Sequence, residues 1–276
     1  MERSTRRAPL WALCLALLIE SCLYAIGLIV VFRKNKLTLT GWTFAKDLAG
    51  VFLRNGWPLV FSGLLVATYQ RVEIFLVAHK LGEAAAGVYS TAQTISDMWA
   101  ILPALILPTI YPLLVQKRVD DPREYERRVQ TAFDLVTALG LCIAIGGTLL
   151  APFIIPLIFG PKYVAAIPVL MIQSCAAPFT FAGVMRAQYF LMENLNIYHA
   201  ASAIMGIAVS VGIALWLMPE IGVIGATTGA LAGYAVSAFF SSWMFPRLHA
   251  CARYQTRSLF ILFRLPSVVA DVRRFL

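Results

Sequence analysis

Seven long apolar segments dominate this chain of 276 residues and restrict what it can fold into. They run approximately over residues 9–32, 57–82, 86–115, 130–159, 163–191, 197–218 and 221–245. The hydrocarbon core of a bilayer is about 30 Å thick, and about 20 helical residues cross it. Charged residues make up 13% of the chain, against about 25% in soluble domains, and the mean hydropathy is +0.77. The sequence therefore predicts an all-α, polytopic membrane helical bundle with about seven transmembrane helices.

The basic residues between these segments predict the orientation of the bundle. Lysines and arginines gather after the first segment, after the third segment and in the tail after the seventh. Arg186, at the end of the fifth segment, falls on the same side, whereas the opposite loops carry only Lys80 and Lys162. Cytoplasmic loops hold the excess of such residues, so we expect a cytoplasmic C-terminus. This distribution also accounts for the net charge of +9, and no nucleic-acid partner is expected.

The same pattern divides the chain into four parts. We expect a first transmembrane helix over 1–32, a cytoplasmic linker over 33–56, a transmembrane lobe over 57–245 and a basic cytoplasmic tail over 246–276. Within the linker, apolar residues such as Phe52 recur on one helical face, which suits an amphipathic helix in the membrane interface. A plain loop is the alternative for this segment.

Two charged residues, Arg71 and Glu73, interrupt the second apolar segment. A charge at that depth costs at least about 3 kcal/mol on insertion scales. Two residues apart on a helix, the two side chains point to nearly opposite faces. If the second and third segments form a hairpin about residues 82–87, Arg71 and Asp97 both lie about 16 Å from the turn, at 1.5 Å per residue. We therefore predict that Asp97 pairs with Arg71, either as a structural ion pair or in the wall of a polar cavity.

Further polar and acidic residues lie close to this pair in the sequence. Gln70, Tyr89 and Gln93 are, with Arg71 and Asp97, candidates for binding a substrate in such a cavity. Hydroxyls and amides also join transmembrane helices by hydrogen bonds, which is the other interpretation. Glu73 and Glu20 are candidates for ion coupling, or simply protonated carboxyl groups in the membrane.

Small residues and prolines predict how the helices pack and bend. The spacing of Gly225, Gly229 and Gly233 favours close packing of the seventh segment against another helix. Prolines interrupt two other segments, which should bend there: Pro103, Pro108 and Pro112 in the third, and Pro168 and Pro178 in the fifth.

The sequence carries no pattern typical of catalysis. It has no nucleotide-binding loop, nucleophile elbow or metal-ligand cluster, and we expect no catalytic residue, metal or cofactor. The three histidines, His79, His199 and His249, lie near the ends of segments, where an interfacial position is expected. The loops after the even-numbered segments are very short, which disfavours a membrane enzyme with a large external active site.

Residues 50–245 resemble the second half of bacterial oligosaccharide flippases, members of the multidrug/oligosaccharidyl-lipid/polysaccharide exporter superfamily. The resemblance lies in Arg54-Asn-Gly-Trp-Pro58, in the hairpin from Leu81-Gly82 to Gly87-Val88-Tyr89-Ser90-x-Ala92, and in Gly222-x-x-Gly225-Ala226. It implies one six-helix lobe of a two-lobe flippase fold, plus one preceding helix, in the bacterial inner membrane. It also implies flipping of polyprenyl-diphosphate-linked oligosaccharide by alternating access around a cationic lumen.

The resemblance implies a C-terminal half, whose partner would be a missing N-terminal lobe or a second copy of the chain. Arg3, Arg6 and Arg7 conflict with the predicted orientation, because seven spans and a cytoplasmic C-terminus place the N-terminus outside. The resemblance accounts for this conflict, since in a complete protein the first helix would be entered from the outside. Three alternatives stay open: a multidrug or cation antiporter of the same superfamily, a non-transporting membrane subunit or fragment, and a membrane enzyme of the same pathways.

Overall fold

The computed structural model describes residues 10–34, 45–69 and 71–260, and within α1 and α2 some side chains lie outside this description. The chain divides into two compact units, Met1–Arg54 and Asn55–Leu276. The first unit contains α1 (Leu10–Lys34), and α2 (Lys46–Tyr69) begins in it and continues into the second. The segment expected at the interface is thus helical from Lys46 and continuous with the second apolar segment. Its position relative to a membrane remains a prediction.

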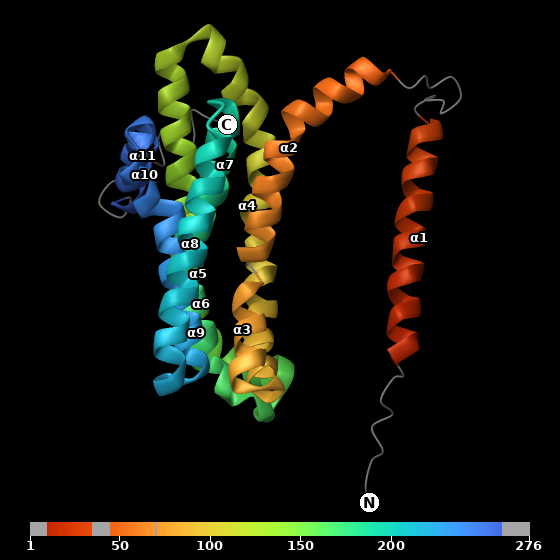
Figure 1. Cartoon of the computed structure of the whole chain (residues 1–276), viewed down its shortest axis with the longest axis vertical. Helices are drawn as coiled ribbons and strands as arrows, with labels where there is room; N and C mark the ends of the chain where they lie inside the picture. The colour runs from red at the N-terminus through yellow and green to blue at the C-terminus, as the bar shows by residue number, and fades with distance from the viewer. Residues whose placement is uncertain (1–9, 35–44, 70, 261–276) are drawn as a thin grey trace, which may run out of the picture. The chain divides into compact units, whose positions relative to one another are not determined.

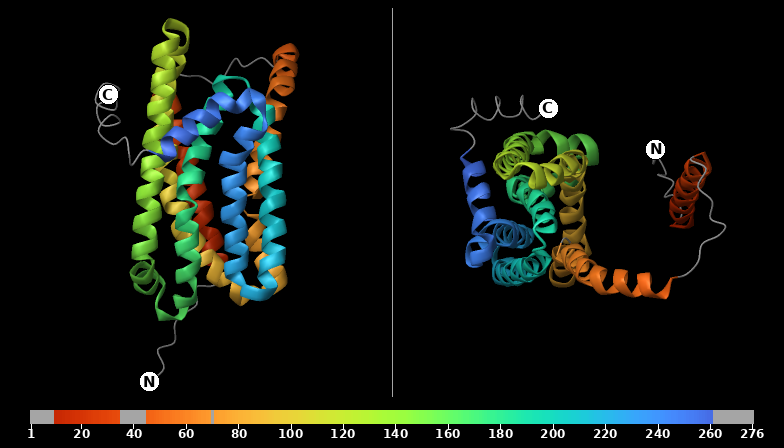
Figure 2. Two further views of the ribbon diagram at one scale, coloured as in Figure 1. Left: turned by 90° about the vertical axis from the view of Figure 1, so that its left-hand side faces the viewer. Right: turned by 90° about the horizontal axis from the view of Figure 1, so that it is seen from above.

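The second unit is a bundle of helices that run up and down beside one another (Figures 1 and 2). The helices with more than two turns are α3 (Val72–Leu81), α4 (Glu83–Asp120), α5 (Pro122–Phe159), α6 (Ile167–Cys175), α7 (Ala177–Met192), α8 (Asn196–Ile221), α9 (Val223–Ala235) and α11 (His249–Leu259). The shorter elements are the 3-10 helices η1 (Pro161–Ala166) and η3 (Pro246–Leu248), the π-helix η2 (Val236–Phe240) and α10 (Ser241–Met244).

Three glycines form the turns at the lower end of the bundle in Figure 1. Gly82, Gly160 and Gly222 follow α3, α5 and α8, each with a positive φ of 86°, 86° and 59°. Only glycine adopts this conformation without a steric penalty from Cβ. The short loops expected after the even-numbered segments are therefore present, and they bring α4, η1 and α9 straight back into the bundle.

At the opposite end, α4 and α5 form a long hairpin rather than two spans joined by a basic loop. Each helix has 38 residues, about 57 Å at 1.5 Å per residue, which exceeds the thickness of a bilayer core. Asp121 separates them and caps α5, because its side chain accepts hydrogen bonds from the backbone N–H groups of Arg123 and Glu124. Pro122 then supplies the favoured first residue of the helix.

A polar clamp joins this hairpin to the turn between α7 and α8. Arg118 of α4 forms an ion pair with Glu193 at 3.0 Å and donates to the carbonyl oxygen of Met192 at the end of α7. Tyr125 of α5 donates to the other carboxylate oxygen of Glu193 at 2.8 Å. The three helices are therefore fixed to one another near the hairpin end.

Two of the expected spans are interrupted, and only one interruption was predicted. The fifth segment is bent by 43° between η1–α6 and α7, next to Pro178, which confirms the expected bend there. The second segment is not one helix: α2 ends at Tyr69 and α3 begins at Val72, with Arg71 as its N-cap. No proline or glycine lies at this break, so an average of hydropathy along the chain does not detect it.

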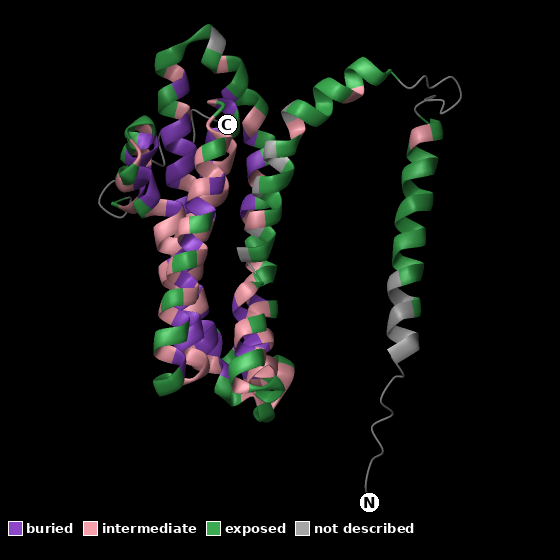
Figure 3. Ribbon diagram, in the orientation of Figure 1, coloured by how far each residue is buried: buried purple, intermediate pink, exposed green. Residues whose placement is uncertain are grey.

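The bundle buries apolar side chains in two clusters (Figure 3). One lies around Phe133, Phe181 and Phe190, and the other around Val77, Ile155 and Leu170. Outward-facing apolar residues, such as Leu105 and Phe153, are exposed, as is expected of a surface that faces lipid.

Glycines of α9 pack closely against α8. A Cβ on Gly225 would lie 2.6 Å from the backbone of Leu217, and one on Gly229 would lie 2.6 Å from the backbone oxygen of Ser210. Gly233 is buried on the same helix, and its oxygen would lie 3.1 Å from a Cβ on Gly206. Small residues permit such contact between membrane helices.

The all-helical membrane bundle is confirmed, although the number of helices that pass as spans is smaller than seven. Among the described residues, four helices are long and apolar enough to cross a membrane, or five if the bent pair counts as one. The break before α3 shortens one expected span. Part of the expected basic tail is α11, which packs against α5 and buries Cys251 and Gln255.

Candidate functional site

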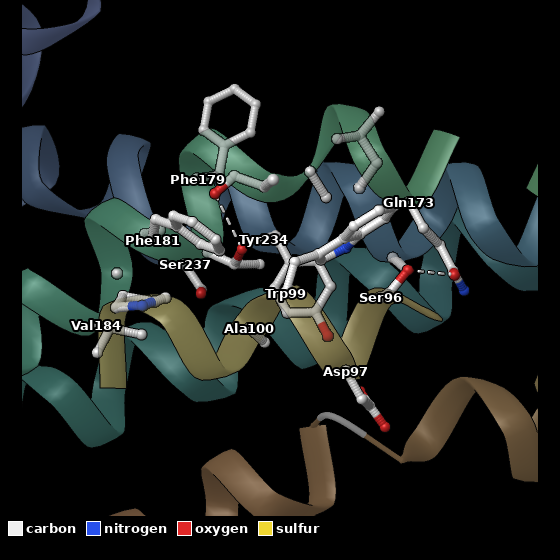
Figure 4. A pocket seen from close by; sticks show the side chains of 18 of the residues that line it. Ser96, Asp97, Trp99, Ala100, Gln173, Phe179, Phe181, Val184, Tyr234 and Ser237 are labelled. Carbon is white, nitrogen blue, oxygen red and sulfur yellow. Dashed lines mark hydrogen bonds between the residues drawn. The ribbon is translucent and has the colours of Figure 1, made fainter. Parts of the chain in front are cut away.

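A cavity of about 570 Å³ lies inside the bundle of the second unit (Figure 4). Its walls come from α4, α6, α7, α8, α9 and η2, together with Arg71 at the start of α3. Along α4 it extends from Tyr89 to Ala104, which is about 22 Å of helix at 1.5 Å per residue. The walls are largely apolar and aromatic, with polar groups at a few places. This combination is typical of ligand pockets.

The predicted contact between Arg71 and Asp97 is present at the edge of this cavity. Arg71 Nη2 lies 3.4 Å from Asp97 Oδ2, and the side chains are 57% and 48% exposed. In Figure 4 the carboxylate of Asp97 points away from α4. Because half of each side chain is exposed, the arginine can exchange its partner for another anion without leaving a buried charge behind.

Polar side chains extend this pair across the cavity wall. Gln93 Nε2 donates to Asp97 Oδ1 at 2.7 Å, and Gln173 Nε2 of α6 donates to Gln93 Oε1 at 3.2 Å. Ser96 donates to Gln173 Oε1 at 2.8 Å (Figure 4). The network ties α4 to α6 and presents amides and hydroxyls beside the arginine. Tyr89, another predicted residue, is buried and lines the same cavity.

The other predicted residues lie elsewhere or outside the description. Gln70 lies outside the described residues. Glu20 lies in α1, in the first unit, with an exposed side chain. Glu73 is 2% exposed, points to α8 and accepts a hydrogen bond from Ser210 Oγ at 2.8 Å. Arg71 and Glu73 therefore face different helices, as their spacing predicted, although Arg71 precedes the helix instead of belonging to it.

The structure places Arg186 inside the bundle, which corrects the expectation that it flanks a cytoplasmic loop. Its side chain is 2% exposed and lines the cavity. Nη1 donates to Ser241 Oγ at 2.7 Å and Ser242 Oγ at 3.2 Å, and the guanidinium lies 4.8 Å from the ring centre of Phe190. Arg186 is only five residues from the expected end of its segment, so hydropathy could not distinguish an interior arginine from an interfacial one.

His199 is the second residue whose position differs from the sequence interpretation. It was expected at the interface, but it lines the cavity and packs edge-on against Phe190. Tyr234, Thr227 and Ser237, from α9 and η2, complete the polar part of the wall. The π-helical turn at η2 has no signal in the sequence, whereas the hydroxyl of Thr227 could have been noticed inside an apolar segment.

The bundle and its cavity define a multi-pass helical membrane protein with a largely apolar chamber between its helices that carries a few polar groups. Residues 7–168, more than half of the chain, match the family described as polysaccharide biosynthesis protein, and the protein therefore belongs to this family. The matched region contains Arg71, Gln93 and Asp97 and ends before Arg186. Searches of curated proteins and of solved structures found no match.

Proposed function

We propose that this protein is part of a transporter that flips polyprenyl-diphosphate-linked oligosaccharide across the bacterial inner membrane by alternating access. The observation that carries the proposal is the cavity with Arg71 in its wall, in a chain that belongs to a polysaccharide biosynthesis family. The site would bind and move its substrate rather than convert it, and the C-terminus would lie in the cytoplasm.

In this proposal Arg71 attracts the anionic part of the substrate. A planar guanidinium makes paired hydrogen bonds to phosphate or carboxylate oxygens. Asp97 orients the arginine and lowers its net attraction for an anion, which lets a bound anion leave again. The amides of Gln93 and Gln173 beside it suit sugar hydroxyls.

The second unit would supply one lobe, and the opposing lobe would come from another chain or a second copy of this one. The break before α3 and the bend before α7 support movement of the lobe as a whole, because interrupted helices are common in transporters that rock.

The test is export of glycan by a strain whose own copy of the gene is replaced by variants. We expect Arg71→Ala to reduce surface glycan and to leave lipid-linked oligosaccharide on the inner leaflet, while Arg71→Lys retains part of the export. Lys80→Ala, at the end of α3 and outside the cavity lining, is the control with the same loss of charge. Normal export by Arg71→Ala would refute the role of this residue, and loss of the oligosaccharide itself would indicate a biosynthetic role instead.

A further inference from the structure

Arg186 is a buried cation whose charge no carboxylate balances among the residues that the structure describes. The ion pairs of Arg71, Arg118, Arg127 and Arg128 include Asp97, Glu193 and Glu124, and none of these acids pairs with Arg186. The groups that contact its guanidinium are two serine hydroxyls, which accept hydrogen bonds, and the face of the Phe190 ring. Removing one partner of a buried ion pair is strongly destabilising because it leaves such a charge. A buried charge without a partner of opposite charge is therefore costly, and we expect such a residue to have a functional role.

Two polar atoms at Arg186 and His199 have no hydrogen-bond partner among the described residues. Arg186 Nε is buried and has no hydrogen-bond partner within the described part of the chain, and the same holds for His199 Nδ1. Both residues line the cavity. Buried polar atoms without partners are rare in native structures, and each calls for an explanation such as an absent ligand.

These groups lie at a different place in the cavity from Arg71. Gln173 contacts Ser96 and Gln93 beside the Arg71–Asp97 pair. Arg186 follows Gln173 by thirteen residues along α6 and α7, which is up to about 20 Å of helix. The wall in between is mostly apolar, with Phe179, Phe181 and Val184. Its one polar side chain, Thr180, donates to the carbonyl oxygen of Ala177. The cavity therefore has two separate cationic positions, of which only the first has an acidic partner within residues 10–34, 45–69 and 71–260.

We propose that Arg186 and His199 form a second anion-binding subsite, which receives a phosphate or carboxylate group at the end of the cavity away from Arg71. The subsite rests on the proposed function only in that a ligand enters this cavity. Of the two arginines, Arg186 is the stronger anion-binding position, because no carboxylate competes for it and the surrounding apolar wall excludes water.

The test measures anion binding by the full purified chain in nanodiscs of phosphatidylcholine, a lipid without net charge. The thermal unfolding midpoint is followed against inorganic phosphate or glucuronate, with sodium chloride at equal ionic strength as reference. A parallel series replaces part of the lipid by phosphatidylglycerol. We expect a saturable rise of the midpoint in at least one series. The first series would identify a soluble anion or acidic sugar, and the second a lipid headgroup.

Variants then assign the effect to the subsite. Arg186→Gln should weaken the apparent affinity about tenfold or more, the loss expected for a hydrogen bond to a charged group. Arg186→Lys should retain part of it, and His199→Gln should weaken it less. Arg253→Gln removes the same charge from an exposed position on α11 and should bind like the unmodified protein. A structural arginine would instead give a destabilised variant and no anion dependence in the unmodified protein.

Two results would overturn the subsite: no anion-specific shift in any series with the unmodified protein, or an unchanged affinity in Arg186→Gln. If Arg186→Gln does not fold, the series with the unmodified protein, Arg186→Lys and His199→Gln still decide. The outcome is separable from the export experiment. If the protein binds anions and the Arg71→Ala variant fails to export glycan, both the subsite and the export role of Arg71 are supported. If the protein binds anions and the Arg71→Ala variant exports normally, only the role of Arg71 is contradicted.

Discussion

Arg71 and Arg186 both line the cavity, and they differ in burial and in partners. Arg71 was identified from its position in the middle of an apolar segment, and equal distances from the turn at Gly82 identified Asp97 as its partner. The sequence does not predict that Arg186 is buried, because the residue lies near the end of its segment, where a long side chain normally reaches the interface. Its burial depends on the serines of α10, which are more than fifty residues away in the sequence.

Glu73 carries the prediction on ion coupling. Glu73→Gln keeps the size of the side chain and still accepts the hydrogen bond from Ser210, but it cannot exchange a proton or bind a cation as a carboxylate does. We expect glycan export to fall at least tenfold while the amount of protein in the membrane stays the same. Export would be measured as surface glycan, with Glu83→Gln, an exposed residue at the start of α4, as the matched control. Normal export by Glu73→Gln would exclude the coupling role.

Cys251 should be the least reactive of the described cysteines. Burial raises the pKa of its thiol to about 12, an effect that Arg186 partly offsets. The reactive thiolate is therefore scarcer at pH 8 than for an ordinary cysteine, and its population increases only as the pH approaches 12. Maleimide labelling followed by mass spectrometry should modify Cys251 only after unfolding in detergent, and the exposed Cys142 before it. Equal labelling rates in the folded protein would contradict the packing of α11.

At the scale of helices, the apolar pattern predicted which segments cross the bundle. It did not predict where the helix in each segment breaks or ends. Hydropathy averages over a window, so the break between α2 and α3 disappears in it. The basic residues near Asp121 suggested a loop between two spans. They lie instead on helices that continue beyond the apolar part, because an aspartate cap followed by proline reverses the chain in one residue. The bend near Pro178 was predictable because proline is a local cause.

The contact between α8 and α9 gives a prediction on stability. Gly229→Ala would place Cβ against the backbone of Ser210 and Ala214, and overpacking of this kind costs about 1–3 kcal/mol. Gly212→Ala is the matched control: it lies on α8, where a Cβ meets nothing within 4 Å, and the two substitutions have the same effect on helix propensity. We expect the unfolding midpoint in detergent to fall for Gly229→Ala and not for Gly212→Ala. Equal midpoints would show that the helices can separate without cost.

At the scale of the whole molecule, composition and segment length were sufficient to predict a helical membrane bundle, since both reflect the bilayer itself. The cavity could not be predicted, because its wall combines residues from helices that are distant in the sequence, such as Gln93 of α4 and Gln173 of α6. Side-chain chemistry could nominate residues for it, and four of the five lumen candidates line it: Arg71, Tyr89, Gln93 and Asp97.

The proposed two-lobe transporter predicts an assembly that can be weighed. Native mass spectrometry of the protein extracted in mild detergent should give either twice the mass of this 30.4 kDa chain or a complex with a second multi-pass protein. Crosslinking in intact membranes before extraction would control for dissociation in detergent. A single chain in both preparations would contradict the two-lobe assembly and favour a non-transporting membrane protein.

The long hairpin of α4 and α5 can act as a lever. The clamp of Arg118, Tyr125 and Glu193 fixes this hairpin to the end of α7, so α4, α5 and α7 are expected to rotate together. If the fulcrum is the end with the glycine turns, a tilt of only about 10° swings the tip by about 10 Å, given an arm of about 57 Å. Motions too small to resolve around the cavity would thus be magnified at Asp121, where a spectroscopic label could report them.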